Sequence, residues 1–206
     1  MSAALEALRR RFGGHQPGLL GARYSCAVLC PLAQTPEGLS LLFEVRASGL
    51  RRQPGEVCFP GGRVEAGETA ERCALRETEE ELSIPRREIE LLGRSDFICS
   101  QSGFLLQPVL GLVSAAGLSA MAPSPAEVAE VFAVPLSFFR EHPPELFAYD
   151  LLPRAPEDFP YDAVGIPADY HWSRGRVDVP IWHWQGHAVW GMTARITADI
   201  IRHLDG

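Results

Sequence analysis

The sequence of 206 residues contains no lysine and no asparagine, so every side-chain cation other than histidine is an arginine. We attribute this arginine excess to biased codon usage and give it no functional weight. A surplus of positive charge is also absent. The formal net charge of -7 argues against general nucleic-acid binding, which needs a basic surface. It does not exclude an anionic substrate, because a metal ion or a local arginine cluster can reverse the field at one site.

Paired cysteines and long apolar runs are missing as well. An odd number of cysteines without CxxC spacing argues against a disulfide-stapled miniprotein and against a zinc site, and favours free thiols in a reducing compartment. No segment is long enough to cross a membrane, and the first residues lack the apolar core of a secretory signal. We therefore expect a cytoplasmic protein with no membrane partner. The five cysteines are Cys26, Cys30, Cys58, Cys73 and Cys99.

The length and the apolar fraction of 46% fit one domain with its own core. Mixed strand and helix patterns predict a layered α/β or α+β domain over residues 1–206. A stretch at about 143–180, rich in Pro, Tyr and Asp, is interpreted as an insertion or lid. The expected elements are an N-terminal helix at about 2–12, strands at 24–32, 39–47, 88–100 and 103–115, a short strand ending at Pro60, a helix at 69–82, a short strand and short helix within 123–143, a strand pair around Gln185 and Gly186, and a C-terminal helix at 192–204.

The predicted helix at 69–82 carries a cluster of acidic residues. Glu77, Glu80 and Glu81 are spaced so that their side chains share one helix face, where like charges repel. A hard divalent cation prefers such oxygen ligands and bridges carboxylates to substrate phosphates. The alternative is a solvated acidic face with Arg72 and Arg76 as local partners.

The segment "GGRVEAGETAERCALRETEEELSI" resembles the signature of Nudix hydrolases. Thr78 stands where that family usually has an aliphatic residue, and Ser83 replaces the final glycine. Neither departure affects an acidic position. The matching positions are Gly62, Glu68, Arg76, Glu77, Glu80, Glu81 and Ile84.

The resemblance implies the Nudix fold, a mixed sheet sandwiched between helices (α/β/α), and metal-assisted hydrolysis of a nucleoside diphosphate linked to another group. It implies that Mg2+ or Mn2+ is bound by Glu77, Glu80 and Glu81. Glu68 would support the loop or an outer metal, and Arg76 would hold a carboxylate in place.

The general base is open, because Nudix enzymes draw it from different places. Glu130 matches a loop glutamate that other members use as metal ligand or base. Glu127 is explained equally well as an ordinary edge-strand carboxylate. We therefore expect Glu130 to be catalytic and Glu127 to be at most a supporting residue.

The upstream segment "RASGLRRQPGEVCFPGG" resembles the element that marks coenzyme A pyrophosphatases within the Nudix family, although the preceding "LFEV" has a glutamate where that subfamily favours threonine. By this resemblance, Arg46, Arg51 and Arg52 would contact substrate phosphates. Gly61 and Gly62 would also belong to the substrate-binding site, where they contribute backbone shape. Solubility and surface pairing are the alternative explanation of the arginines.

The resemblance implies hydrolysis of coenzyme A or its derivatives to 3′,5′-ADP and 4′-phosphopantetheine, with a small-molecule nucleotide as partner. One alternative is a Nudix pyrophosphatase for ADP-ribose, dinucleotides or noncanonical nucleotides. Another is a catalytically silent nucleotide-binding sensor. A homodimer is an expectation that no residue pattern supports directly.

Overall fold

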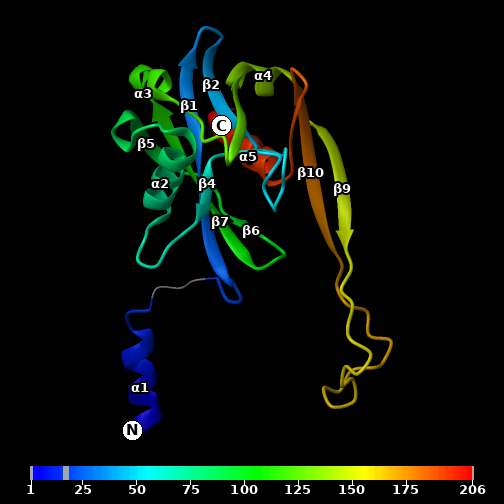
Figure 1. The fold of residues 1–206 in the computed structure, drawn as a ribbon. Helices are drawn as coiled ribbons and strands as arrows, with labels where there is room; N and C mark the ends of the chain where they lie inside the picture. Colours follow the sequence, from blue (N-terminus) through cyan, green and yellow to red (C-terminus); the bar gives the residue numbers. More distant parts are fainter. Residues whose placement is uncertain (1, 16–18, 206) are drawn as a thin grey trace.

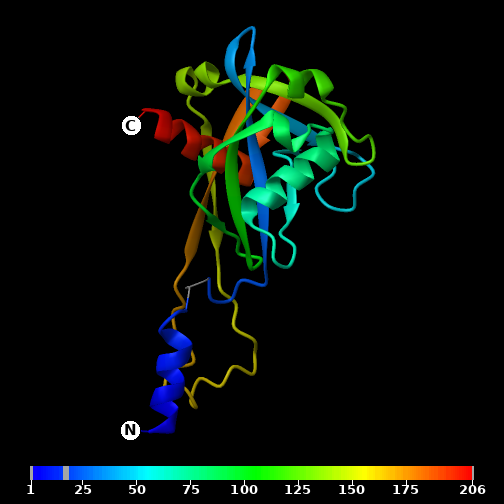
Figure 2. The ribbon, with the colours of Figure 1, turned by 90° about the vertical axis from the view of Figure 1, so that its left-hand side faces the viewer.

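The computed structural model describes residues 2–15 and 19–205 and shows a mixed β-sheet with helices on both faces (Figures 1 and 2). The strands of this sheet are β1 (Tyr24–Thr35), β2 (Gly38–Arg46), β3 (Val57–Cys58), β4 (Gly61–Arg63), β5 (Ile89–Arg94), β6 (Ile98–Cys99), β7 (Phe104–Val113) and β8 (Val128–Pro135). Within the described ranges the order is β3-β2-β1-β7-β5, and β4, β6 and β8 pair with β1, β7 and β2 respectively. β1 runs parallel to β7, and the other pairs are antiparallel.

Helices on opposite faces give the sheet two apolar cores. Figure 2 shows α2 and α3 on one side of β1 and β7, and α5 on the other. Alternate β1 side chains enter different cores: Ala27 and Leu29 pack with α2 residues, whereas Cys30 and Leu32 pack with α5 residues. The α/β/α architecture expected from the sequence is confirmed. The helices are α1 (Ala3–Phe12), α2 (Ala70–Leu82), the 3-10 turn η1 (Arg86–Glu88), α3 (Ala115–Ala120), α4 (Leu136–Glu141) and α5 (Gly191–Asp205).

A second sheet has the order β11-β10-β9 and comprises β9 (Glu145–Leu151), β10 (Gly175–Trp184) and β11 (His187–Trp190). The expected strand pair around Gln185 and Gly186 is present, with Trp184 opposite His187. β9 and β10 form a long hairpin beside the main sheet (Figure 1). The sequence did not predict β9, which lies within the segment interpreted as an insertion or lid. A role as a lid stays a prediction.

The N-terminal helix α1 lies apart from the sheet in both views (Figures 1 and 2), and none of its residues is buried. It begins after Ser2, whose side chain accepts a hydrogen bond from the Ala4 backbone N–H. Across the described residues, every helix is too short or too polar to cross a membrane.

Helix α2 begins at a side-chain cap and ends at a left-handed residue. Thr69 Oγ1 accepts a hydrogen bond from the Arg72 N–H at 3.3 Å. The helix ends at Ser83, which adopts the left-handed conformation (φ 57°, ψ 22°), and its Oγ donates to the Ala122 carbonyl at 2.8 Å. Thr78 is fully buried and donates its hydroxyl back to the Ala74 carbonyl at 2.7 Å. The two departures from the family signature are therefore accommodated, Thr78 within the helix and Ser83 just after its last residue.

The left-handed cap generates a stability prediction. Ser83→Gly and Ser83→Ala both lose the hydrogen bond to Ala122, but only glycine adopts the left-handed conformation without a steric penalty. We expect the glycine variant to exceed the alanine variant in free energy of unfolding by about 1 kcal/mol. Urea denaturation of both proteins measures the difference. Equal midpoints, or a more stable alanine variant, would contradict it.

Candidate active site

The backbone of β4 lies directly against the carboxylates of α2. The Gly61 N–H donates to Glu81 Oε2 at 2.8 Å. A Cβ atom on Gly62 would lie 2.3 Å from Glu77 Oε1, and one on Gly61 would lie 2.4 Å from the Ala27 carbonyl oxygen. The two glycines are therefore required because β4 is confined between β1 and α2, with no space for a side chain on either face.

Arg76 contacts three acidic side chains. Its guanidinium lies 3.1 Å from Glu68 Oε1, 2.7 Å from Glu77 Oε1 and 3.2 Å from Glu80 Oε2. Hydrogen bonding to Arg76 holds the pKa of Glu68 below its usual range, and the same contacts raise the pKa of Arg76. Arg76 thus orients carboxylates from both the loop before α2 and the helix itself.

The carboxylates of α2 differ in burial. The Glu81 residue is 5% exposed, whereas the Glu80 side chain is 56% exposed. Burial raises the pKa of Glu77 and Glu81, and the nearby charge of Glu44 raises that of Glu81 further. Arg76 alone does not offset the charge that Glu77, Glu80 and Glu81 carry when all three are ionised, so full ionisation of this group requires a further cation.

This donor set fits a divalent cation such as Mg2+ or Mn2+. Carboxylate oxygens are the ligands these ions prefer, and the cation would offset the excess charge. The side chains are now held by other partners: Arg76 binds Glu77 and Glu80, and the Gly61 N–H binds Glu81. The three carboxylates therefore share a face without their oxygens converging on one point.

A different group brings three ligand atoms within 4.8 Å of one another in the described part of the chain, namely Asp96, Asp199 and His203. Arg202 forms ion pairs with Asp96 and Asp199, so their charge is already offset. This group lies on α5 and the β5–β6 connection, away from the family signature. It is best explained as a surface ion-pair cluster.

Glu44 is a residue of the site that the sequence analysis did not select. It is 1% exposed and lies opposite Cys58 across the β2–β3 pair. The Cys58 thiol donates to Glu44 Oε1 at 3.2 Å, whereas Oε2 has no hydrogen-bond partner among the described residues. Burial raises the pKa of Glu44. An acidic residue in the middle of the apolar strand "LSLLFEVRA" was the available signal.

The two acidic candidates outside the signature are both exposed but differ in their surroundings. The charge of Glu127 raises the pKa of Glu44, Glu77 and Glu81. Its loop is attached to the end of α2, because the Ser124 N–H donates to the Glu81 carbonyl and the Glu127 N–H to the Ser124 carbonyl. The structure therefore brings Glu127 close to the carboxylate cluster.

Glu130 has a different partner. Its carboxylate lies 3.3 Å from His187 Nε2, and the His187 ring stacks on Phe132 with centroids 4.0 Å apart. This contact places Glu130 beside the second sheet, at β11. The sequence analysis favoured Glu130 as the catalytic residue and Glu127 as a supporting one. In the structure Glu127, not Glu130, is the residue that lies near the carboxylates of α2.

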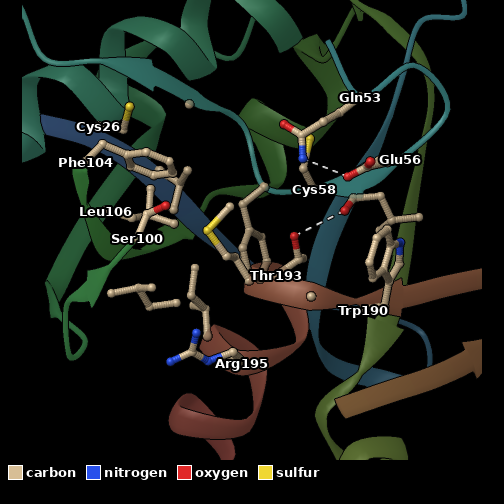
Figure 3. Close-up of a pocket in the computed structure, with 18 of the residues that line it drawn as sticks. Cys26, Gln53, Glu56, Cys58, Ser100, Phe104, Leu106, Trp190, Thr193 and Arg195 are labelled. Atoms are coloured by element: carbon tan, nitrogen blue, oxygen red, sulfur yellow. Dashed lines mark hydrogen bonds between the residues drawn. The ribbon is translucent and has the colours of Figure 1, made fainter. Parts of the chain in front are cut away.

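A cavity of about 420 Å3 lies beside β4 (Figure 3). Its walls come from the β2–β3 region, from β6 and β7, from the β9–β10 hairpin and from α5. Gly61 and Gly62 line it too, so β4 connects the cavity with the carboxylates. Arg46 is a lining residue, whereas Arg51 and Arg52 lie outside the lining and are exposed.

The lining of the cavity combines apolar and polar side chains. Phe104 and Leu106 on β7 are apolar, and Trp190 at the end of β11 presents an aromatic ring (Figure 3). The Tyr149 hydroxyl donates to Gln101 Oε1 at 3.3 Å, which connects the hairpin to the turn between β6 and β7. Such a lining suits an organic ligand with a few fixed polar groups.

The sequence matches the model of the NUDIX domain over residues 24–153. This chain belongs to the Nudix family. The match contains β4, α2 and the Glu127 loop, and ends just after β9. Nudix hydrolases act on pyrophosphate bonds of small nucleotide substrates and generally use divalent metals such as Mg2+ or Mn2+.

Two curated Nudix relatives share 34% of aligned residues with this chain. "Uncharacterized Nudix hydrolase NudL" of Photorhabdus laumondii aligns over 184 residues, which cover 86% of this chain and 83% of that protein. "Peroxisomal coenzyme A diphosphatase NUDT7" of Mus musculus aligns over 147 residues, which cover 68% of this chain and 61% of that protein. Among solved structures, the Nudix hydrolase RenU of M. smegmatis has a TM-score of 0.49 at 22% identity and covers 59% of this chain and 78% of its own.

The two glycines of β4, Gly61 and Gly62, allow a matched pair of variants. In Gly62→Ala, the new Cβ meets the end of a flexible side chain, Glu77, so the fold can persist while that carboxylate is displaced. In Gly61→Ala, the new Cβ meets the backbone of Ala27 and Val28, which cannot move freely. We expect Gly62→Ala to keep a near-normal melting temperature and weaken Mn2+ binding by about tenfold or more. Gly61→Ala should instead lower the melting temperature.

Calorimetric Mn2+ titration and thermal denaturation of both proteins check this expectation. Unchanged Mn2+ affinity in Gly62→Ala would show that the position of Glu77 against β4 does not matter for the cation.

The buried carboxylate of Glu44 gives a pH-dependent prediction. Because burial raises its pKa from 4.5 to about 7 in the folded state, its contribution to stability is greatest below pH 4.5 and is lost as the pH rises from there through about 7. Glu44→Gln removes that titration. In protein freed of divalent cations, the stability of the variant relative to wild type should increase by about 1–3 kcal/mol between about pH 5 and about pH 8. Urea denaturation at both pH values measures it, and an equal difference at both would contradict it.

Proposed function

We propose that this Nudix hydrolase cleaves the diphosphate bond of coenzyme A or a coenzyme A derivative, giving 3′,5′-ADP and 4′-phosphopantetheine or its acylated form. The observation that carries the proposal is the cavity beside β4. It adjoins the strand that contacts the carboxylates and is lined by Arg46 and by apolar and aromatic side chains. A diphosphate at β4 would leave the organic parts of the substrate in this cavity. The mouse relative named as a coenzyme A diphosphatase supports the same substrate class.

Within this proposal, the chain supplies the ligands of Mg2+ or Mn2+ and holds them in position. Glu77, Glu80 and Glu81 would bind the cation, which offsets charge on phosphoryl oxygens and lowers the pKa of water. Arg76 orients Glu77 through its contact at 2.7 Å, and Glu68 in turn fixes Arg76. Arg46 would neutralise diphosphate oxygens from the cavity side. Arg51 and Arg52, exposed on the loop, would act on the approach of an anionic substrate rather than in the cavity.

Glu127 is the better candidate for the group that accepts the proton of the attacking water. Its charge is felt by Glu44, Glu77 and Glu81, and its loop is tied to the end of α2. Glu130 is engaged by His187 instead. A carboxylate on a short anchored loop meets the requirement that a general base lie within reach of the reacting water.

The proposal treats residues 1–206 as a single Nudix domain with residues at about 143–180 as an insertion or lid, of which Tyr149 and Val177 line the cavity. It also places the protein in the cytoplasm, with homodimer formation as an additional expectation. Each of these statements can be tested independently of the reaction. Deletion of residues 152–174 tests the role of this segment and leaves the carboxylates of α2 unchanged.

The reaction is tested by incubating the purified protein with coenzyme A, with and without Mg2+ or Mn2+, and identifying the products by mass spectrometry. We expect metal-dependent 3′,5′-ADP and 4′-phosphopantetheine. In Glu81→Gln, which keeps the side-chain shape but removes its charge, turnover should fall by about 100-fold or more because a buried ligand charge is lost. Near-wild-type turnover of this variant, in a folded state by circular dichroism, would refute the ligand role.

The same assay discriminates the alternatives. Cleavage of ADP-ribose or a dinucleotide in place of coenzyme A would keep the Nudix chemistry and reject the substrate. Metal-dependent nucleotide binding without any turnover would identify a sensor rather than an enzyme.

A further inference from the structure

Helix α5 carries an arginine that faces the cavity from the side opposite the main sheet. Arg195 is a lining residue, and Figure 3 shows its side chain beside α5, away from Gln53 and Glu56. The helix is fixed here by its buried neighbours Ala194 and Ile196. The position of Arg195 is therefore set by the packing of α5 rather than by a mobile loop.

The first turn of α5 is also hydrogen-bonded to β3, the strand that precedes β4. The Thr193 hydroxyl donates to the Val57 carbonyl at 3.2 Å, and the Thr197 hydroxyl donates to the Thr193 carbonyl at 2.9 Å. Val57 lies in β3, next to the turn that leads into β4. These contacts hold Arg195 at a defined place relative to the strand that contacts the carboxylates.

Arg195 has no hydrogen bond or ion pair with any described residue of the chain. By contrast, Arg202 on the same helix pairs with Asp96 and Asp199. The carboxylate of Asp178, which lines the same cavity, is 3.3 Å from the guanidinium of Arg176. In a chain with a net charge of -7, an unpaired guanidinium on a cavity wall is suited to an anionic ligand group.

Arg46 and Arg195 line the cavity from different elements, β2 and α5. One of them can serve a diphosphate at β4, and the other then faces a separate part of the ligand. We propose that Arg195 binds a phosphate monoester that the substrate carries apart from its diphosphate. Resting on the proposed coenzyme A reaction, this inference assigns to Arg195 the selection of substrates that bear the ribose 3′-phosphate.

The test compares coenzyme A with 3′-dephospho-coenzyme A, which lacks that phosphate and keeps every other group. Wild type should show a lower KM for coenzyme A. Arg195→Gln should raise the KM for coenzyme A by about 10- to 100-fold, as expected for loss of a charge-assisted hydrogen bond. It should change the KM for the dephospho form by less than about twofold and leave kcat for both nearly unchanged. Arg195→Lys should restore part of the preference, because the charge is kept while the bidentate geometry is lost.

Arg202→Gln, on the same helix but outside this cavity, is the matched control and should retain the wild-type preference. Calorimetric titration with 3′,5′-ADP and with 5′-AMP provides a readout without turnover: Arg195→Gln should lose the tighter binding of 3′,5′-ADP. Thermal denaturation confirms that the exposed substitution leaves the fold intact.

The outcomes separate the two levels of inference. Equal KM values of wild type for the two substrates, or an equal rise for both in Arg195→Gln, would overturn the role of Arg195 and keep the coenzyme A reaction. Absence of cleavage of either substrate by wild type would overturn the proposed function, and the assignment of Arg195 with it.

Discussion

The contact between the backbone of β4 and the carboxylates of α2 is the constraint on which the site depends. It requires glycine at 61 and 62, because a Cβ at either position would meet the backbone of β1 or the carboxylate of Glu77. It also removes solvent from Glu81, whose carboxylate accepts a hydrogen bond from the Gly61 N–H. The close approach therefore puts carboxylates in a poorly solvated place, where their interaction with a divalent cation would be stronger than in bulk water.

The same contact explains why Arg76 is placed between the acidic side chains. Carboxylates crowded on one helix face repel each other, and without a cation among them the helix would lose stability. Arg76 offsets part of this repulsion and holds Glu68 and Glu77 in fixed orientations. One guanidinium does not offset the charges of all these carboxylates when they are ionised, and Glu44 adds a buried carboxylate to them. An additional cation would therefore stabilise their ionised forms. The crowded carboxylates lower the stability of the fold, and the same crowding favours binding of a cation between them.

The sequence predicted the parts of the fold that depend on local patterns. The helix expected at 69–82 corresponds to α2, which spans Ala70–Leu82. β9 was missed because the apolar residues of its sequence ELFAYDL do not alternate with polar ones, and because prolines precede and follow it. The relative positions of Glu127 and Glu130 were not predictable either. They depend on how the loop before β8 attaches to α2 and on the stacking of His187 on Phe132, both of which are long-range contacts.

The carboxylate helix is one continuous segment, whereas the cavity is assembled from segments distant in the sequence. Its lining combines Arg46, Tyr149 and Arg195, which lie on β2, β9 and α5. Such side chains can change without disturbing the contacts of β4 with α2, so the cavity can diverge while the carboxylate cluster persists. The Thr193–Val57 hydrogen bond limits this independence, because it fixes α5 to the strand that precedes β4. The orientation of the cavity relative to the carboxylates is thereby fixed, and differences in what the cavity accepts depend on the few charged and aromatic side chains on its walls.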